Sequence, residues 1–165
     1  MEEIQGRSLS ALGHAQESLR LYQAAGHRPG EANALNAIGW CQAQLGRYRD
    51  AIGSCTQALA VYRELGNRPA EATTLDTLGY AHHQLGQHAE AIACCQQAID
   101  AQGAVGDLGN RADMLIHLGD AHHASGDSES ARRAWQQALA ILDDLDEPAA
   151  AAAEVRSRLA SDARG

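Results

Sequence analysis

Residues 26–65 read GHRPGEANALNAIGWCQAQLGRYRDAIGSCTQALAVYREL, and residues 66–105 read GNRPAEATTLDTLGYAHHQLGQHAEAIACCQQAIDAQGAV. Aligned without gaps, the two stretches are identical at 15 of 40 positions, and residues 106–145 match the second stretch at 13 of 40 positions. A sequence that repeats itself with a period of roughly 20–50 residues is typical of solenoids, propellers and other repeat arrays. The sequence therefore predicts three successive copies of one structural unit, at 26–65, 66–105 and 106–145.

Each copy contains two apolar patterns at helical spacing. In the first copy one pattern occupies residues 35–45 and the other residues 51–59, with Gly46 between them. Apolar residues three and four positions apart predict amphipathic helices, and no stretch of the chain alternates with the period of two that indicates a strand. Between copies, Gly66 favours a helix stop and Pro69 favours the first turn of the next helix. Each unit is therefore predicted to be a helical hairpin, and the fold to be all-α.

The two ends of the chain differ from the three copies. Residues 6–25 align with the second helix of a unit, for example Tyr22 with Tyr62, but only five residues precede them. We therefore expect 6–25 to be the second helix of an incomplete repeat, and the whole chain to be the tail of a longer protein. Residues 148–163 predict a single amphipathic helix, of the kind that caps a terminal repeat.

The positions where the two helices of a unit would meet resemble the tetratricopeptide repeat family. The family pattern has a large apolar residue, a Leu-Gly pair, and then a small alanine, an aromatic residue and another alanine on the second helix. The third copy places these residues in the same order, as Leu115, Leu118-Gly119, Ala131, Trp135 and Ala138. The resemblance implies one domain, a right-handed superhelical solenoid of helix-turn-helix hairpins with a C-terminal capping helix.

Two features depart from the usual family pattern. Cys55 and Cys95 occupy the aromatic position of the first two copies, and the period is 40 residues rather than about 34. Leu65-Gly66-Asn67 between copies is similar to the Leu-Gly-Asn subclass of the family. Units of this kind resemble the C-terminal arrays of large bacterial transcription regulators that respond to signals, notably the SARP type of actinomycetes.

Small residues are expected where the helices cross. Gly39 on the first helix of a unit should face Ala51 or Ala58 on the second, which leaves room for the two backbones to approach closely. A bulky residue at such a position would clash. The glycines of this chain are therefore predicted to serve helix packing and unit boundaries rather than a phosphate-binding loop.

The resemblance also predicts where a partner binds, because in this family the first helices of successive units line a concave groove. Trp40 and Tyr80 occupy equivalent positions and are expected to stand side by side there, as an amphipathic binding platform. The alternative left open is that these rings pack against a neighbouring unit or domain. The predicted partner-binding residues are Asn33, Asn36, Trp40, Gln44, Thr73, Asp76, Thr77, Tyr80, His83, Gln84, Asp113, His117, Asp120 and His123.

The charges of the chain limit the partner. Net charge is −8, and all 13 basic residues are arginines. An acidic surface repels a phosphate backbone, so direct nucleic-acid binding by this segment is not expected. Family members that clamp a peptide carboxylate need cations in the groove, and the predicted groove has none unless a histidine is protonated. We therefore expect a basic or neutral protein segment, or the nucleotide-binding domain of the parent chain.

Histidine and cysteine are the residues that suggest chemistry, yet both are better explained structurally. His82-His83 and His122-His123 recur in register, but helices about 8–10 Å apart place equivalent side chains too far apart to share one metal ion easily. His83 and His123 remain candidates for pH-dependent binding, since histidine titrates near neutrality. The four cysteines show no Cys-x-x-Cys spacing and are expected to be small buried thiols. No metal or cofactor site is predicted.

No sequence motif predicts catalysis or membrane insertion. The chain has no lysine for a Walker A loop or a Schiff base, no Gly-x-Ser-x-Gly elbow and no His-Glu-x-x-His pair. It has no long apolar run and no signal peptide, which favours a cytoplasmic protein that is not an enzyme.

Three functions therefore stay open. The first is a regulatory protein-interaction array at the C-terminus of a SARP-type regulator, the second an adaptor or scaffold without a transcriptional role, and the third the substrate-docking part of an enzyme. A homodimer through the open face of residues 6–25 is a further expectation.

Overall fold

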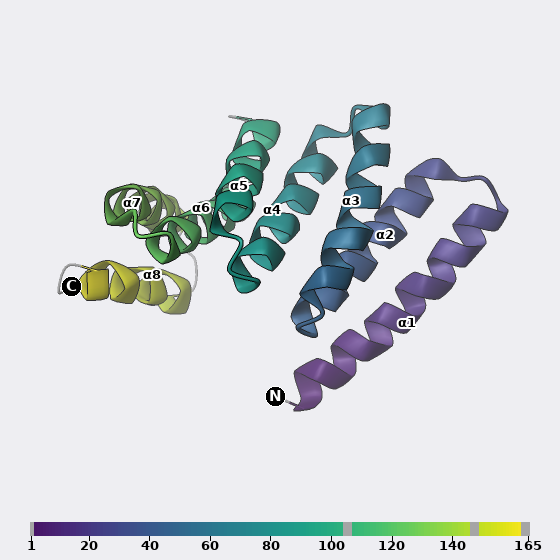
Figure 1. Ribbon diagram of the computed structural model, residues 1–165, viewed down its shortest axis with the longest axis horizontal. Coiled ribbons are helices and arrows are strands. Elements are labelled where there is room, and N and C mark those ends of the chain that lie inside the picture. Colours follow the sequence, from purple (N-terminus) through teal and green to yellow (C-terminus); the bar gives the residue numbers. More distant parts are fainter. Residues whose placement is uncertain (1, 104–106, 146–148, 163–165) are drawn as a thin grey trace.

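The computed structural model describes residues 2–103, 107–145 and 149–162, and within these ranges the chain forms eight α-helices and no strand (Figure 1). The prediction of an all-α fold is confirmed. The helices stack side by side in chain order, so each packs on the next: α1 (Glu2–Ala24), α2 (Arg28–Gln44), α3 (Tyr48–Leu65), α4 (Arg68–Gln84), α5 (His88–Gln102), α6 (Leu108–Ala124), α7 (Ser128–Asp144) and α8 (Ala149–Asp162).

The first helix of every hairpin begins with a side-chain cap at the same position of the repeat. His27, Asn67 and Asp107 each accept a hydrogen bond from the backbone N–H three residues later, at 2.9, 3.2 and 2.9 Å. These bonds satisfy amide groups that the start of a helix leaves unpaired. Gly66 ends α3 in the left-handed conformation, with a φ of 66° that favours glycine. The residues at each unit boundary therefore determine where one hairpin ends and the next begins.

The two helices of each hairpin cross at a glycine. A methyl group added to this glycine would overlap the residue at the aromatic position of the second helix, which is Cys55 opposite Gly39, Cys95 opposite Gly79 and Trp135 opposite Gly119. The carbonyl oxygen of Ala51 would lie only 3.3 Å from a methyl group at Gly39. The expected close approach of Gly39 to Ala51 is therefore present, but the nearest atom belongs to the residue one turn further along.

The core continues from one hairpin into the next. Its largest cluster joins Cys55 and Leu59 of α3 to residues of α4, α5, α6 and α7, and a second cluster places Trp135 of α7 against Val155 of α8. Cys55 and Val155 are fully buried. This arrangement suits a solenoid, in which each unit is stabilised by its neighbours rather than by one central core.

Some predicted boundaries differ from the helices. Helix α1 starts at Glu2 rather than near Gly6, and α5 ends at Gln102, so the second hairpin closes earlier than the first. The predicted boundary between residues 105 and 106, and the expected ends of the capping helix at 148 and 163, lie outside the described residues. None of the described helices is long and apolar enough to cross a membrane.

Helix α1 has one covered and one open face. Leu12 is buried against α2, whereas Leu9 and Leu21 are about half exposed, at 50% and 56%. The exposed side chains of α1 include these two leucines together with polar residues such as Arg7 and Glu17. Self-association through the open face stays a prediction.

Candidate peptide-binding groove

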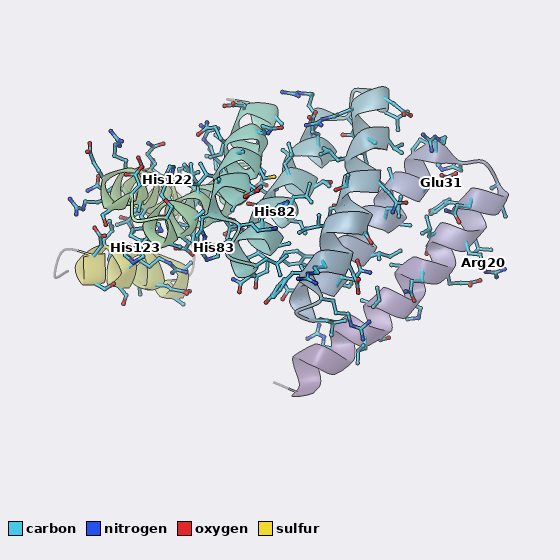
Figure 2. The ribbon with its side chains drawn as sticks, viewed as in Figure 1. Arg20, Glu31, His82, His83, His122 and His123 are labelled. Carbon is cyan, nitrogen blue, oxygen red and sulfur yellow. The ribbon has the colours of Figure 1, made fainter. Side chains whose placement is uncertain are left out.

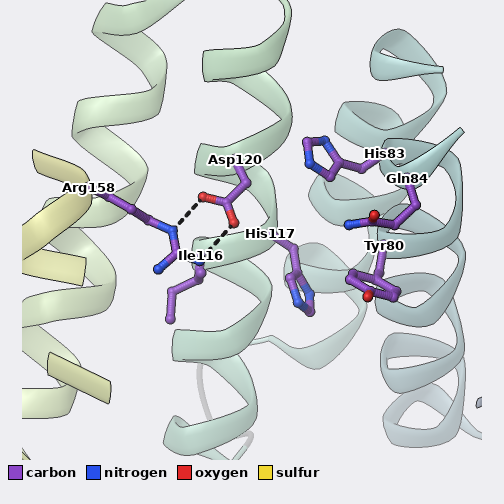
Figure 3. A pocket seen from close by; sticks show the side chains of 7 residues that line it. All are labelled: Tyr80, His83, Gln84, Ile116, His117, Asp120 and Arg158. Carbon is purple, nitrogen blue, oxygen red and sulfur yellow. Dashed lines mark hydrogen bonds and ion pairs between the residues drawn. The ribbon is translucent and has the colours of Figure 1, made fainter. Parts of the chain in front are cut away.

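The first helices contact their neighbours of the same kind, α2 with α4 and α4 with α6, in addition to their partners within the hairpins, and they line one face of the stack. Two pockets hollow this face. The one named here the Trp40 pocket has a volume of about 280 Å³ and lies among all three helices, lined by Asn36, Trp40, Thr73, Asp76, Thr77, Asn110, Asp113 and Met114. The other, the Arg158 pocket, has a volume of about 190 Å³ and lies between α4, α6 and α8, lined by Tyr80, His83, Gln84, Ile116, His117, Asp120 and Arg158 (Figure 3).

Eleven of the fourteen residues predicted for the groove line these two pockets. The other three lie elsewhere. Asn33 accepts a hydrogen bond from the hydroxyl of Tyr62 at 2.8 Å, Gln44 is exposed, and the ring of His123 packs against Trp135. The repeat therefore places most of the predicted side chains on one continuous surface, and their role in binding stays a prediction.

Arg158 is the main residue that sequence reasoning missed. It belongs to α8, which lies outside the repeat, so equivalence between copies could not place it in the groove. In Figure 3 its side chain extends from α8 toward Asp120 of α6. The expectation that the groove has no basic residue other than histidine is wrong, because the capping helix supplies one. Ile116, Asn110 and Met114 were also missed.

Asp120 on α6 is hydrogen-bonded to residues of both α7 and α8. Its Oδ1 accepts hydrogen bonds from Nε of Arg158 at 2.9 Å and from Nε1 of Trp135 at 3.0 Å, and its Oδ2 accepts one from Arg158 at 3.2 Å. Burial alone would lower the pKa of Arg158, but Asp120 and Glu154 outweigh it and the pKa is raised. Arg158 therefore stays protonated, and its positive charge is paired with the carboxylates of Asp120 and Glu154.

A second pair joins the two pockets. Nδ1 of His117 on α6 lies 2.8 Å from Oδ1 of Asp76 on α4. Burial alone would lower the pKa of His117, but the hydrogen bond and charge of Asp76, with the charges of Asp113 and Asp120, raise it above its usual value. The pair therefore favours a protonated His117, and Asp76 also lines the Trp40 pocket.

The expected aromatic platform has a different form. Tyr80 packs edge-on against Tyr48 at 6.1 Å between ring centroids, and its ring is tilted against that of His117 at 5.5 Å. Tyr80 and His117 both line the Arg158 pocket. Trp40 lines the other pocket, and in the described part of the chain no ring contact joins it to Tyr80. Trp40 is 46% exposed, a large fraction for so large an apolar side chain. The two rings therefore do not stack on each other, and their role as a binding platform stays a prediction.

The two histidine pairs lie in the last turns of α4 and α6 (Figure 2). Nδ1 of His82 lies 2.8 Å from the side-chain oxygen of Gln87, and Nδ1 of His122 lies 3.4 Å from Asp127. The ring of His83 packs on His88 at 5.6 Å, and burial lowers the pKa of His83. Among the described residues no group of three or more His, Cys, Asp or Glu side chains could hold a metal ion.

The cysteines are free thiols within the helices. Cys41, Cys55 and Cys95 are buried, whereas Cys94 is partly exposed. Burial raises the pKa of Cys55 to about 12 and that of Cys95 further still. Since the thiolate is the reactive form, the thiols of Cys55 and Cys95 are expected to be unreactive. Three of the four cysteines are buried as predicted, and Cys94 is not.

The fold and groove define a helical-repeat protein, and comparison with known proteins names its family. A family model described as tetratricopeptide repeat matches residues 1–64, 44–103 and 70–144, so the chain belongs to the tetratricopeptide repeat family. Domains of this family are protein–protein interaction modules, typically without enzymatic activity. None of the curated proteins matches the chain.

Solved structures share the fold. BtubC (BKLC) from P. vanneervenii is 19% identical, with a TM-score of 0.75 over 86% of this chain and 59% of the BtubC chain, so this chain spans less than two thirds of that protein. The TPR-like repeats of a Podosopora anserina protein assigned as a kinesin light chain are 16% identical, with a TM-score of 0.78 over 99% of this chain and 81% of that chain. At these identities the similarity establishes the solenoid fold.

Proposed function

We propose that the groove on α2, α4 and α6 is where this module binds a segment of another protein. The observation that carries the proposal is the half-exposed Trp40 in a pocket formed by all three helices. Tryptophan is enriched among the residues that dominate binding energy at interfaces, so a half-exposed tryptophan ring in a pocket is a candidate anchor for a partner. Pockets on successive first helices also suit an extended segment, which reaches one pocket after the other.

The charge of the groove favours a basic or neutral segment. Three carboxylates, those of Asp76, Asp113 and Asp120, line the two pockets together with two basic groups, His117 beside Asp76 and Arg158 beside Asp120. The whole chain carries a net charge of −8, which steers cationic partners toward it. A peptide that ends in a free carboxylate would meet these aspartates without an unpaired arginine to receive it.

The finer part of the proposal concerns the parent protein. The 40-residue period and the Leu65-Gly66-Asn67 boundary support a regulatory array of a signal-responsive, SARP-type transcription regulator. In such a protein, a segment bound in the groove would shift the equilibrium between inactive and active states only if it bound one state more tightly. The segment would come from a partner or from the nucleotide-binding domain of the same chain.

Peptide selection tests the binding function. A displayed library of random peptides is selected on the purified protein, and the affinities of the enriched peptides are measured for wild type, Trp40→Ala and Arg133→Ala. Arg133 is a matched control because it is exposed on α7, away from the two groove pockets. We expect Trp40→Ala to weaken binding at least about tenfold, as for a hot-spot residue, and Arg133→Ala to leave it unchanged. Equal losses in both variants, or no enriched peptide, would refute the proposal.

The regulator context has its own test. An antibody raised against this domain detects the native protein in its source cell by immunoblot. A band several times heavier than 17.5 kDa, with DNA-binding and nucleotide-binding sequences upstream, is expected. A band near 17.5 kDa would remove the regulator and leave a free-standing adaptor.

A further inference from the structure

The Trp40 pocket is lined by two carboxylates, two hydroxyl groups, two amide groups, the Trp40 ring and the side chain of Met114. Asp76 and Asp113 contribute carboxylates, and among the described residues no basic side chain lines this pocket. Two threonines add acceptor oxygens, because their hydroxyl hydrogens are already used. Thr73 donates to the carbonyl oxygen of Ala70 at 3.1 Å, and Thr77 donates to that of Thr73 at 3.1 Å. The amide groups of Asn36 and Asn110 can donate as well as accept, whereas the carboxylates and hydroxyl oxygens accept, so a cationic ligand with several N–H donors matches the pocket.

The ring of Trp40 on the wall of the pocket indicates which kind of ligand binds there. A guanidinium or ammonium group within about 6 Å of a tryptophan ring is attracted by the face of the ring, and arginine is the more frequent partner. The planar guanidinium of arginine also has five N–H donors and no acceptor, which suits a pocket of carboxylates and hydroxyls. Trp40 and Asp113 are both exposed, so a side chain can reach them from solvent.

The size of the pocket favours one side chain rather than a free metabolite. Its volume of about 280 Å³ lies just below the range of roughly 300–1,000 Å³ that is typical of small-molecule sites. It is open along the groove, so a long side chain can enter while its backbone stays on the surface of α2 and α4. A segment of protein is thus a better match than a cofactor.

The groove itself contains an example of the same recognition. In the Arg158 pocket, the two oxygens of Asp120 accept hydrogen bonds from Nε and a terminal nitrogen of Arg158, at 2.9 and 3.2 Å (Figure 3). This is the forked contact that a carboxylate makes with a guanidinium. Asp76 has a single hydrogen-bond contact with Nδ1 of His117, and an ionised carboxylate has about four lone-pair sites, so this contact leaves acceptor capacity.

We infer that the Trp40 pocket binds an arginine side chain of the partner segment, with the guanidinium against the Trp40 ring and hydrogen-bonded to Asp76 and Asp113. This inference rests on the proposed function and names the chemistry that the groove selects. The second pocket, where Arg158 and Asp120 are already paired, takes a neutral part of the same segment.

Small probes test the pocket directly. N-acetyl-arginine amide is titrated into the ¹⁵N-labelled protein, and the two indole N–H signals are followed by NMR. Trp135 is buried and bonded to Asp120, so its signal is an internal reference for Trp40. We expect the Trp40 signal to shift with a Kd of about 1 mM, which is reasonable for so small a ligand. N-acetyl-citrulline amide, which has the same shape without the charge, should leave it in place.

Two variants distinguish binding of the arginine probe in the pocket from unspecific attraction to the acidic surface of the protein. Asp113→Asn should weaken the arginine probe about tenfold, by removing one charge from the guanidinium site. Asp100→Asn removes an exposed charge on α5, outside this pocket, and should change nothing. Equal shifts with arginine and citrulline, or equal losses in the two variants, would overturn the inference. If N-acetyl-lysine amide bound as tightly as the arginine probe, the inference would also be overturned, because the planar guanidinium group would then make no contribution to binding.

The peptide selection distinguishes failure of this inference from failure of the proposed function. Enriched peptides are expected to contain an arginine whose replacement by citrulline lowers affinity about tenfold. Peptides that require Trp40 but contain no arginine would overturn the inference and leave the interaction groove standing. A shift of Trp40 by the arginine probe, without any peptide that depends on Trp40, would leave the pocket standing and refute the proposed function.

Discussion

Gly79→Ala tests the helix crossing that sets the spacing of the solenoid. An added methyl group would overlap the sulfur of Cys95 and lie 3.3 Å from the carbonyl oxygen of Ala91. Both Cys95 and Ala91 are fully buried, so the thiol cannot move aside into solvent. Overpacking of this kind costs about 1–3 kcal/mol. Alanine in mid-helix returns about 0.5–1 kcal/mol relative to glycine, so a net loss of roughly 0–2.5 kcal/mol is expected.

Gly53→Ala is the matched control. Gly53 also lies within a helix, but it is exposed and no atom lies within 4 Å of an added methyl group. It should therefore gain the intrinsic 0.5–1 kcal/mol or so. The difference between the two variants isolates the contact and should be about 1–3 kcal/mol. Urea unfolding followed by circular dichroism measures both free energies.

A double variant completes the test. Cys95→Ala removes the sulfur that the new methyl group would overlap, so Gly79→Ala should cost less in that background than alone. Neighbouring substitutions that share one space are not additive, and coupling of about 0.5–3 kcal/mol is typical. Equal stability changes for Gly79→Ala and Gly53→Ala, or strict additivity with Cys95→Ala, would refute the close approach of α4 and α5.

Three further predictions concern charge and reactivity. Burial would lower the pKa of His117, but Asp76 holds this pKa above its usual value. The pair therefore stabilises the fold fully at a pH below about 6.5, the pKa of histidine in the unfolded chain. This stabilisation is lost as the pH rises through the pKa of His117 in the folded protein. The difference in unfolding free energy between wild type and His117→Gln should thus be larger near about pH 5.5 than near about pH 8.5, and a constant difference would contradict it. Arg158→Met should lower the stability by about 1 kcal/mol through loss of a half-buried ion pair, measured by the same urea assay, and an unchanged midpoint would mean that α8 docks without it. Cys55, with its pKa raised to about 12 by burial, should be alkylated far more slowly than Cys94 in the native protein, as followed by mass spectrometry of peptides, and equal rates would show that Cys55 is accessible.

The sequence predicts this fold well because the information is repeated. Leu, Gly and Ala recur at a fixed spacing in all three copies, and local signals such as Asn67 and Gly66 mark where one hairpin ends and the next begins. Equivalence between copies also predicts which side chains share a face. That is why most of the expected groove residues line the two pockets.

The sequence does not predict contacts that differ from one unit to the next. Trp40 and Tyr80 occupy equivalent positions of the repeat, but Tyr80 packs against the rings of Tyr48 and His117. The residues at the corresponding positions around Trp40 are different ones. Arg158 lies outside the repeat, and its reach toward Asp120 depends on how α8 docks. Such pairings depend on three-dimensional neighbours that the period of the sequence does not encode.

Hydrogen exchange of the protein, with and without a selected arginine-containing peptide, tests most directly that the groove is the binding surface. Protection measured helix by helix should increase in α2, α4 and α6 and stay unchanged in the second helices α3, α5 and α7. Protection confined to α3, α5 and α7, or to the open face of α1, would show that the partner binds elsewhere and that the groove is not the functional site.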